Sequence, residues 1–542
     1  MTTTSADNPP SRRTTLADTR RPRRSAAGPD RPAGSGQPTH HGTLVAACAA
    51  VFIAQLGLVL PAAINGEMQR ALQTSGSELT WISAAFLVPI AMLSLTFGLL
   101  GDLYGRKKLL VAGSVAMTIG FAVSAMSNDV HTLWLGQAIA GIGAAILFAT
   151  SLALVTFATP GARQRAIGLA AWTTALSTGA LVAPPMSGLL TEHYGFNWAF
   201  GVSAVVAAVT VLTGALLSRD SRAPEGRALD WPGQLSIAGS LLALLFGVIE
   251  GPELGWTSPA VAGALLVSAV LLVVFIMVET RTAKPLLRLD LFRIPSFAAA
   301  AVVSVIGMFG FLGGAYVLSI RLGVIQHQST VRAAIPFLII QAVTPFIWPL
   351  LVRLLRLVGP RIMIVTGLVA IAAGQLLLLA TPITATGIGS IMLSLILNGI
   401  GFGLLVSALT AAAVNAVPLN FAGMASATSS MMRDLGQTLA PAIIGTVALT
   451  QAAPLALAGL RNADGLAPAQ LGAAEGILAE GGPLALATVP LGPQVTAAAS
   501  DALAHGYDRG LLVTALSCLV GALVAAVFLR GGKAPATQQA GH

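Results

Sequence analysis

The chain has 542 residues, of which 55% are apolar and only 9% are charged. A soluble domain carries about 25% charged residues, so this composition excludes an ordinary soluble fold and indicates that lipid is the main solvent. The net charge of +9 could suggest a nucleic-acid partner, but the placement of the cations indicates membrane topology instead, with no nucleic acid involved.

Residues 1–42 are polar and rich in Pro, Ser and Arg, which predicts a disordered cytosolic tail. Fourteen apolar segments follow, each long enough to cross a bilayer with some tilt. Because lipid offers no partner to an open backbone, we expect all of them to be helices of an all-α polytopic membrane protein. The segments lie near 43–63, 80–100, 108–127, 132–157, 166–190, 198–217, 231–250, 260–279, 296–318, 333–355, 361–381, 386–413, 429–450 and 509–529.

The cations predict how the chain is oriented in the membrane. If the amino terminus is cytosolic, all but five of the 30 Lys and Arg residues lie on the cytosolic side, as expected for a multi-pass protein of the plasma membrane. The five exceptions are Arg70, Arg321, Arg332, Arg461 and Arg509. An even number of spans then returns the tail at 531–542 to the cytosol.

One long connection, residues 451–508, falls on the outer side. Its Ala, Gly, Leu and Pro composition favours a poorly ordered surface loop, with a short interfacial helix at 473–479. A lid over the outer mouth is the alternative interpretation.

The chain contains a distant copy of itself. Gly141, Gly143 and Pro160 are repeated 258 residues later, and Gly179, Pro184 and Gly188 are repeated 257 residues later, at the positions Gly399, Gly401, Pro418, Gly436, Pro441 and Gly445. We therefore expect two pseudo-symmetric six-helix bundles, 43–217 and 296–530. The region 218–295 has no copy and predicts an inserted helix pair. Such halves suit a transporter with a central site.

The turn after the second segment reads Gly-Leu-Leu-Gly-Asp-Leu-Tyr-Gly-Arg-Lys and resembles the loop signature of the major facilitator superfamily. Small residues allow helices to approach, a glycine can turn the chain, and a carboxylate at a helix end can make a contact that forms in one conformation and breaks in another. The resemblance implies a conformational switch. Its residues are Gly98, Gly101, Asp102, Gly105, Arg106 and Lys107.

The fifth segment resembles the antiporter signature of the exporting branches of this superfamily. The resemblance implies a closely packed helix that seals against leak, while ordinary helix packing is the alternative. The residues concerned are Gly179, Ala183, Pro184, Pro185 and Gly188. Fourteen spans, the inserted pair and Gly255-Trp256 after the seventh segment resemble the 14-helix drug:proton antiporter branch.

Two positions depart from that branch. Helix one usually carries an acid and helix four an arginine, but this chain has Gln55 and Gln137 in these regions. A buried amide still needs partners, so we expect both to face the cavity and to bond each other, water or substrate. An interhelix bond is an equal alternative.

Few ionisable residues remain within the spans. Arg433 and Asp434 begin the thirteenth segment, and Asp434 is the candidate proton carrier, with a helix-start cap as the alternative. Cys48 and Cys518 lie in separate apolar runs and make neither a disulfide framework nor a thiolate site. The sequence contains no phosphate-binding loop and no metal-ligand cluster, so we expect no cofactor, no metal and no enzyme.

We therefore expect a bacterial, monomeric secondary transporter that exports lipophilic drugs or natural products in exchange for protons. The resemblance implies proton coupling, which the neutral Gln55 and Gln137 leave open. The alternatives are an uncoupled facilitator or uptake carrier, and a membrane scaffold or sensor that transports nothing.

Overall fold

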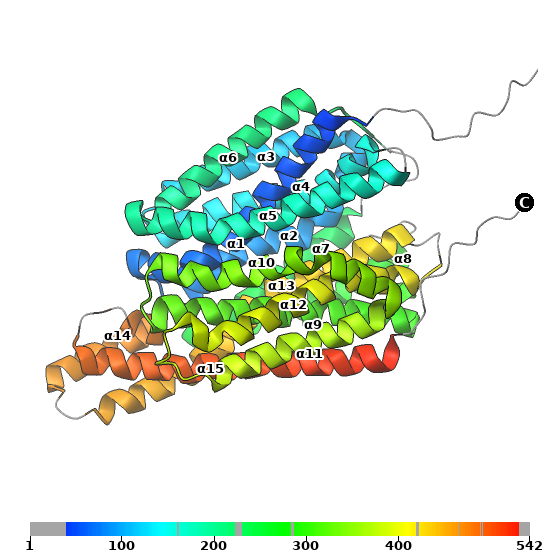
Figure 1. Cartoon of the computed structure of the whole chain (residues 1–542). Coiled ribbons are helices and arrows are strands. Elements are labelled where there is room, and N and C mark those ends of the chain that lie inside the picture. Colours follow the sequence, from blue (N-terminus) through cyan, green and yellow to red (C-terminus); the bar gives the residue numbers. More distant parts are fainter. Residues whose placement is uncertain are drawn as a thin grey trace, which may run out of the picture. The chain divides into compact units, whose positions relative to one another are not determined.

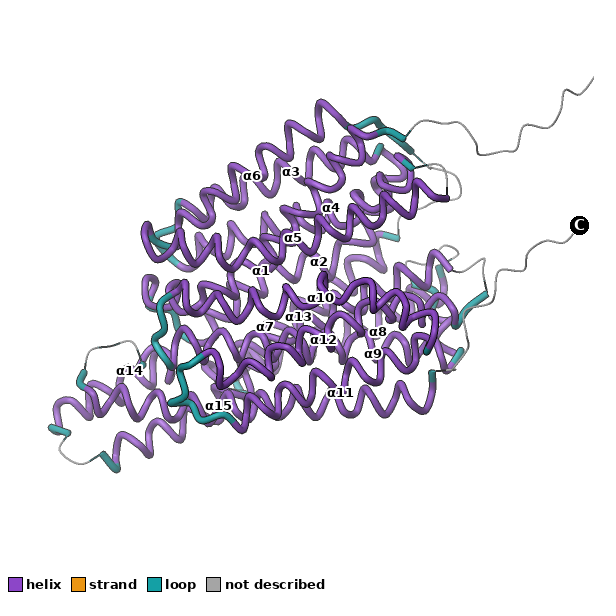
Figure 2. Tube along the Cα trace, viewed as in Figure 1, coloured by secondary structure: helices purple, strands orange, loops and turns teal. Residues whose placement is uncertain are grey.

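A computed structural model describes residues 39–159, 162–222, 230–282, 287–418, 422–463, 466–487, 489 and 491–529. Within these ranges every regular element is helical (Figures 1 and 2). The first half contains α1 (His41–Leu72), α2 (Gly76–Tyr104), α3 (Arg106–Ala125), α4 (Val130–Ala158), α5 (Ala162–Tyr194) and α6 (Phe196–Leu217). The second contains α9 (Pro295–Ile320), α10 (Thr330–Leu357), α11 (Gly359–Ala380), α12 (Ile388–Asn415), α13 (Ala422–Arg461) and α15 (Pro493–Phe528).

Five further elements lie between and beside these helices. They are the inserted pair α7 (Trp231–Leu254) and α8 (Pro259–Arg281), the helix α14 (Pro468–Leu486) between α13 and α15, and two short turns, a 3₁₀ turn at Leu289–Arg293 and a π turn at Arg321–Ile325. Fourteen of the described helices are long and apolar enough to cross a membrane. The predicted all-α fold with fourteen spans is therefore confirmed.

Equivalent glycines make equivalent contacts in the two halves. Gly141 of α4 lies so close to the Phe86 carbonyl of α2 that a Cβ would overlap it, and Gly399 of α12 lies in the same way against the Ile340 carbonyl of α10. Gly179 of α5 packs against the backbone of α1 as closely as the equivalent Gly436 of α13 packs against the backbone of α9. The repeat in the sequence is thus a repeat in packing, because only glycine allows such close helix crossings.

The inserted pair lies beside the seam between the halves. Helix α7 contacts both α2 and α13, and Leu245 and Ile249 share a small apolar core with Val88 of α2 and Ala442 of α13. Helix α8 packs against α7 and is the least buried of the fourteen spans, so its remaining surface faces lipid.

The prediction of a poorly ordered loop at 451–508 is wrong for most of that range. Helix α13 continues to Arg461, α14 covers the expected short helix at 473–479, and α15 begins at Pro493. The Ala- and Leu-rich composition has a high helix propensity that persists beyond the apolar window. Gly482, with a φ of 69°, kinks α14 before Pro483. The predicted tail at 531–542 lies outside the described residues. The same holds for the predicted tail at 1–42, except for its last four residues, 39–42.

Candidate functional site

A cavity of about 500 Å³ lies between the two halves. Its walls are mostly apolar and aromatic, with a few polar side chains, which is the usual make-up of a small-molecule site. Eight helices supply the side chains that we use below: Gln55 of α1, Asp102 of α2, Arg106 of α3, Phe148 of α4, Trp172 of α5, Met308 of α9, Phe402 of α12, and Ser426, Ser430, Met431, Arg433, Asp434 and Gln437 of α13.

The halves meet at the end of the molecule that carries the α1–α2 turn. Asn65 Nδ2 donates to Ser319 Oγ at 3.1 Å, and the hydroxyls of Thr80 and Tyr316 lie 3.1 Å apart. A Cβ placed on Gly66 would come within 2.6 Å of the Gly323 backbone. The cavity instead extends toward the α2–α3 turn, where Asp102 and Arg106 line it. The site is therefore closed at one end.

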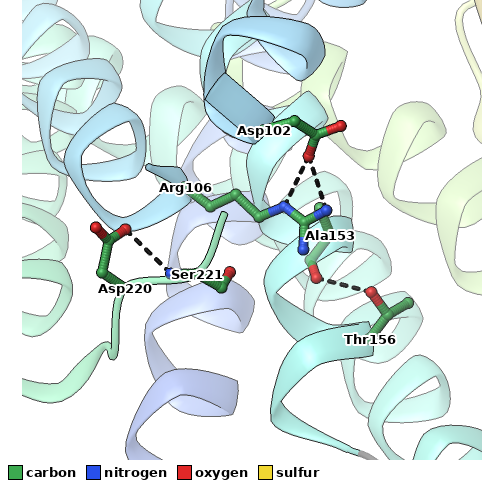
Figure 3. A network of polar contacts seen from close by, with 6 residues as sticks. All are labelled: Asp102, Arg106, Ala153, Thr156, Asp220 and Ser221. Carbon is green, nitrogen blue, oxygen red and sulfur yellow. Dashed lines mark hydrogen bonds and ion pairs between the residues drawn. The ribbon is translucent and has the colours of Figure 1, made fainter. Parts of the chain in front are cut away.

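The α2–α3 turn is held by a network of polar contacts (Figure 3). Arg106 donates to Asp102 Oδ1 from Nη2 at 2.7 Å and from Nε at 3.0 Å. The backbone N–H of Arg106 donates to Ser221 O at 3.0 Å, and that of Lys107 donates to Asp220 Oδ1 at 3.2 Å. The predicted switch residues thus lie together at the cavity mouth, tied to the segment that follows α6.

The glycines of this motif have different surroundings. Gly105 has a φ of 115°, and a Cβ there would lie 2.7 Å from the Asp220 carboxylate, so this turn requires glycine. A Cβ on Gly101 would be 3.3 Å from Thr150 of α4, and one on Gly98 would be 3.8 Å from Ala149. Gly101 therefore supports close packing, and Gly98 only borders the cavity.

One of the antiporter-type residues, Gly188, contacts the other half. Gly188 faces α10, where a Cβ would lie 3.1 Å from the Thr330 carbonyl oxygen and from the Ala334 side chain. Ala183 is fully buried, and α5 runs without interruption through Pro184 and Pro185. Gly179 allows α5 to approach α1 within the first half. None of these five side chains lies among the residues that line the cavity.

The two glutamines do not meet. Gln55 lines the cavity, whereas Gln137 is fully buried and its Nε2 donates to Ser124 Oγ of α3 at 3.0 Å. The expectation that Gln137 faces the cavity is wrong, because its position on α4 turns it toward α3. The alternative interhelix bond is what the structure contains.

Arg433 and Asp434 both line the cavity. Arg433 Nη2 donates to Ser430 Oγ at 3.2 Å, while Nε is buried without a hydrogen-bond partner in the described part of the chain. Because α13 begins at Ala422, Asp434 lies twelve residues into the helix, about 18 Å at 1.5 Å per residue. The alternative of a helix-start cap is therefore wrong, since the first turn lies well before this residue.

Three polar lining residues of α13 were missed from the sequence, namely Ser426, Ser430 and Gln437. Together with the predicted Arg433 they follow one another at spacings of four, three and four residues, which is one face of a helix. This polar stripe could have been found by that spacing. Trp172, whose Nε1 donates to Ser151 Oγ at 3.0 Å, gives no comparable signal.

No group of three His, Cys, Asp or Glu side chains that could hold a metal ion occurs among the described residues. Among the described residues that line the cavity, Asp102 and Asp434 are the acids, and the first is paired with Arg106. The arrangement can bind a small molecule in the cavity and leave it accessible from one end, as a carrier protein requires.

Two repeated helical halves around a cavity closed at one end define a secondary transporter. The family profile described as Major Facilitator Superfamily matches residues 45–441, which is more than half of the chain. The chain belongs to this superfamily, as predicted. It is a membrane transport protein and not an enzyme.

Relatives agree with that assignment. The chain is 29% identical over 411 residues to the multidrug resistance protein Stp of Mycobacterium tuberculosis (strain CDC 1551 / Oshkosh). The aligned region covers 75% of each chain. It is 31% identical over 412 residues to the puromycin resistance protein pur8 of Streptomyces alboniger, covering 73% of this chain and 80% of the relative.

Among solved structures, a bacterial homologue of the human lysosomal transporter Spinster, in an inward-facing and unoccupied conformation, shares the fold. The TM-score is 0.59 at 15% identity, and the match covers 92% of this chain and all of the other. This similarity supports the fold alone.

Proposed function

We propose that this protein exports lipophilic drugs or natural products from the cytosol by alternating access, driven by inward proton flow. The central cavity carries the proposal, because it lies between the two halves, which hydrogen-bond each other at the α1–α2 end. Rocking of the halves would close the α2–α3 end and open the other, which moves the bound molecule across the membrane.

The walls of the cavity favour a lipophilic substrate. Phe148, Trp172, Met308, Phe402 and Met431 supply apolar and polarisable surface, and the polar groups are few. The relatives named for multidrug and puromycin resistance make antibiotics and similar compounds the first substrates to test.

The orientation of the carrier rests on the cations. With all but five Lys and Arg residues on one side, we assign the termini and the α2–α3 turn to the cytosol, so that the cavity would open inward. A monomer in the bacterial plasma membrane satisfies this arrangement, since both halves of the site come from one chain.

Asp434 is the group that we assign to proton coupling. It is the one cavity acid among the described residues that has no ion-pair partner within hydrogen-bond range, whereas Asp102 is held by Arg106. A carboxylate that alternately faces a binding cavity and each side of the membrane can exchange its proton for substrate.

The experiment compares two fluxes of a lipophilic fluorescent dye in proteoliposomes. We expect Asp434→Asn to lose proton-gradient-driven export and to keep passive exchange of the dye, with Gln437→Asn as a control at the same cavity wall. Driven export that survives in Asp434→Asn would refute the coupling role. It would favour an uncoupled facilitator, which the neutral Gln55 and Gln137 also suggest.

A further inference from the structure

A second groove, of about 490 Å³, lies between α7 and α13 and is separate from the central cavity. Val248 of α7 forms one wall, and Ile443, Thr446 and Val447 of α13 form the other. Both helices cross the membrane, so the groove lies within the apolar spans. The transport mechanism proposed above does not use it.

The groove changes from apolar to polar along its length. Val248, Ile443 and Val447 are apolar, and the hydroxyl of Thr446 already donates to the Val248 carbonyl oxygen at 2.6 Å. Thr450 and Gln451 are exposed at the end nearer α14. From Ile443 to Gln451 the helix rises about 12 Å. These properties match one chain of an amphiphile whose polar part lies at the interface.

Trp256 closes that polar end, and two glycines fix its position. Gly255 has a φ of 87° and reverses the chain after α7, while a Cβ on Gly251 would lie 2.8 Å from the Trp256 indole ring. The indole therefore folds back onto α7. Tryptophan is enriched where hydrocarbon meets headgroups, so this end of the groove lies at the membrane surface.

Helix α7 is attached to the first half at both of its ends. Trp81 Nε1 donates to Glu250 Oε1 at 2.7 Å and Ser77 N donates to Glu253 Oε1 at 2.9 Å. At the other end Gln234 hydrogen-bonds both Thr96 and the Met92 carbonyl. Toward α13 the described residues supply one hydrogen bond, from Thr446. Rocking of the halves would therefore move α13 against α7 and change the groove.

We propose that an acyl chain of a phospholipid in the outer leaflet fills this groove in the conformation described here. An unfilled groove between apolar walls leaves Val248, Ile443 and Val447 without packing contacts on one side, and water finds hydrogen-bond partners only toward the Thr450 and Gln451 end. The surrounding bilayer supplies chains of the required chemistry at the open side. The lipid would move out when α13 slides against α7.

The test uses the full chain in nanodiscs of phosphatidylethanolamine and phosphatidylglycerol. A trace of phosphatidylcholine with a photoactivatable diazirine in one acyl chain is added, and the irradiated protein is mapped by peptide mass spectrometry. We expect labelling of residues 443–451 to exceed labelling around Val267 and Val270, which are exposed on α8. No transport is needed, so failure of the proposed function leaves this result unaffected.

Two substitutions fill the groove from opposite walls, Val447→Trp and Val248→Trp. Each should abolish labelling of residues 443–451 and retain labelling of α8, which also reports that the protein is inserted. Val270→Trp, on the lipid-facing side of α8, should leave the groove labelling unchanged. The proposal is overturned if both filling variants are labelled like the wild type, or if 443–451 is labelled no more than α8. Labelling there by a photoactivatable lipophilic drug but not by the lipid would also overturn it.

Discussion

Asp102 lies where the binding cavity meets the α2–α3 turn, and its side chain is 7% exposed. It accepts two hydrogen bonds from Arg106, which is itself 17% exposed and lines the cavity mouth. The last turn of α2 is the negative end of that helix, so the carboxylate is stabilised by its ion pair with Arg106, which contributes roughly 0.2–1 kcal/mol. That energy is small against fourteen inserted helices but large enough to shift a balanced two-state equilibrium severalfold.

We therefore expect Asp102→Asn to insert normally and to export a lipophilic dye severalfold more slowly than the wild type. The measurement compares initial rates of dye export at matched expression. Lys108→Gln, which removes an exposed cation near the same turn, is the control. Equal rates for Asp102→Asn and the wild type would show that the pair with Arg106 has no part in switching.

At the scale of the helices, the crossings of α4 with α2 and of α12 with α10 depend on one glycine each. Gly141→Ala and Gly399→Ala would each force a methyl group against a backbone carbonyl, at a cost of about 1–3 kcal/mol. Both variants should therefore unfold at a lower temperature in detergent. Gly389→Ala in α12, which has nothing within 4 Å of the added carbon, should not. A normal melting temperature for either crossing variant would contradict the shared packing.

The helices were predictable because each span must be apolar over a fixed length, whatever it packs against. The ends of α13 and the full length of α14 were not predictable, because helices that leave the membrane no longer need apolar residues, and hydropathy does not detect them. The partner of the Gln137 side chain could not be predicted from the sequence either. Its sequence position identifies the helix, but only the packing of α3 beside α4 shows that Ser124 is its partner.

At the scale of the whole molecule, one conformation is held by contacts between the halves at the α1–α2 end. Gly66 and Gly323 are central to that closure, since a Cβ on Gly66 would come within 2.6 Å of the Gly323 backbone. Asn65 and Ser319, which share a 3.1 Å hydrogen bond, report directly whether this end is closed. Cysteines at these two positions can be cross-linked by mild oxidation.

We expect Gly66→Ala to slow oxidative cross-linking of the pair Asn65→Cys and Ser319→Cys, because the added methyl group separates α1 from the α9–α10 turn. The background carries Cys48→Ser and Cys518→Ser, so that no other thiol competes. Gly263→Ala in α8, where nothing lies within 4 Å of an added Cβ, should cross-link at the parent rate. Since alternating access requires this end to open, the cross-linked parent should also stop exporting dye and recover after reduction. Export that continues in the fully cross-linked protein would mean that substrate leaves by a route other than this end.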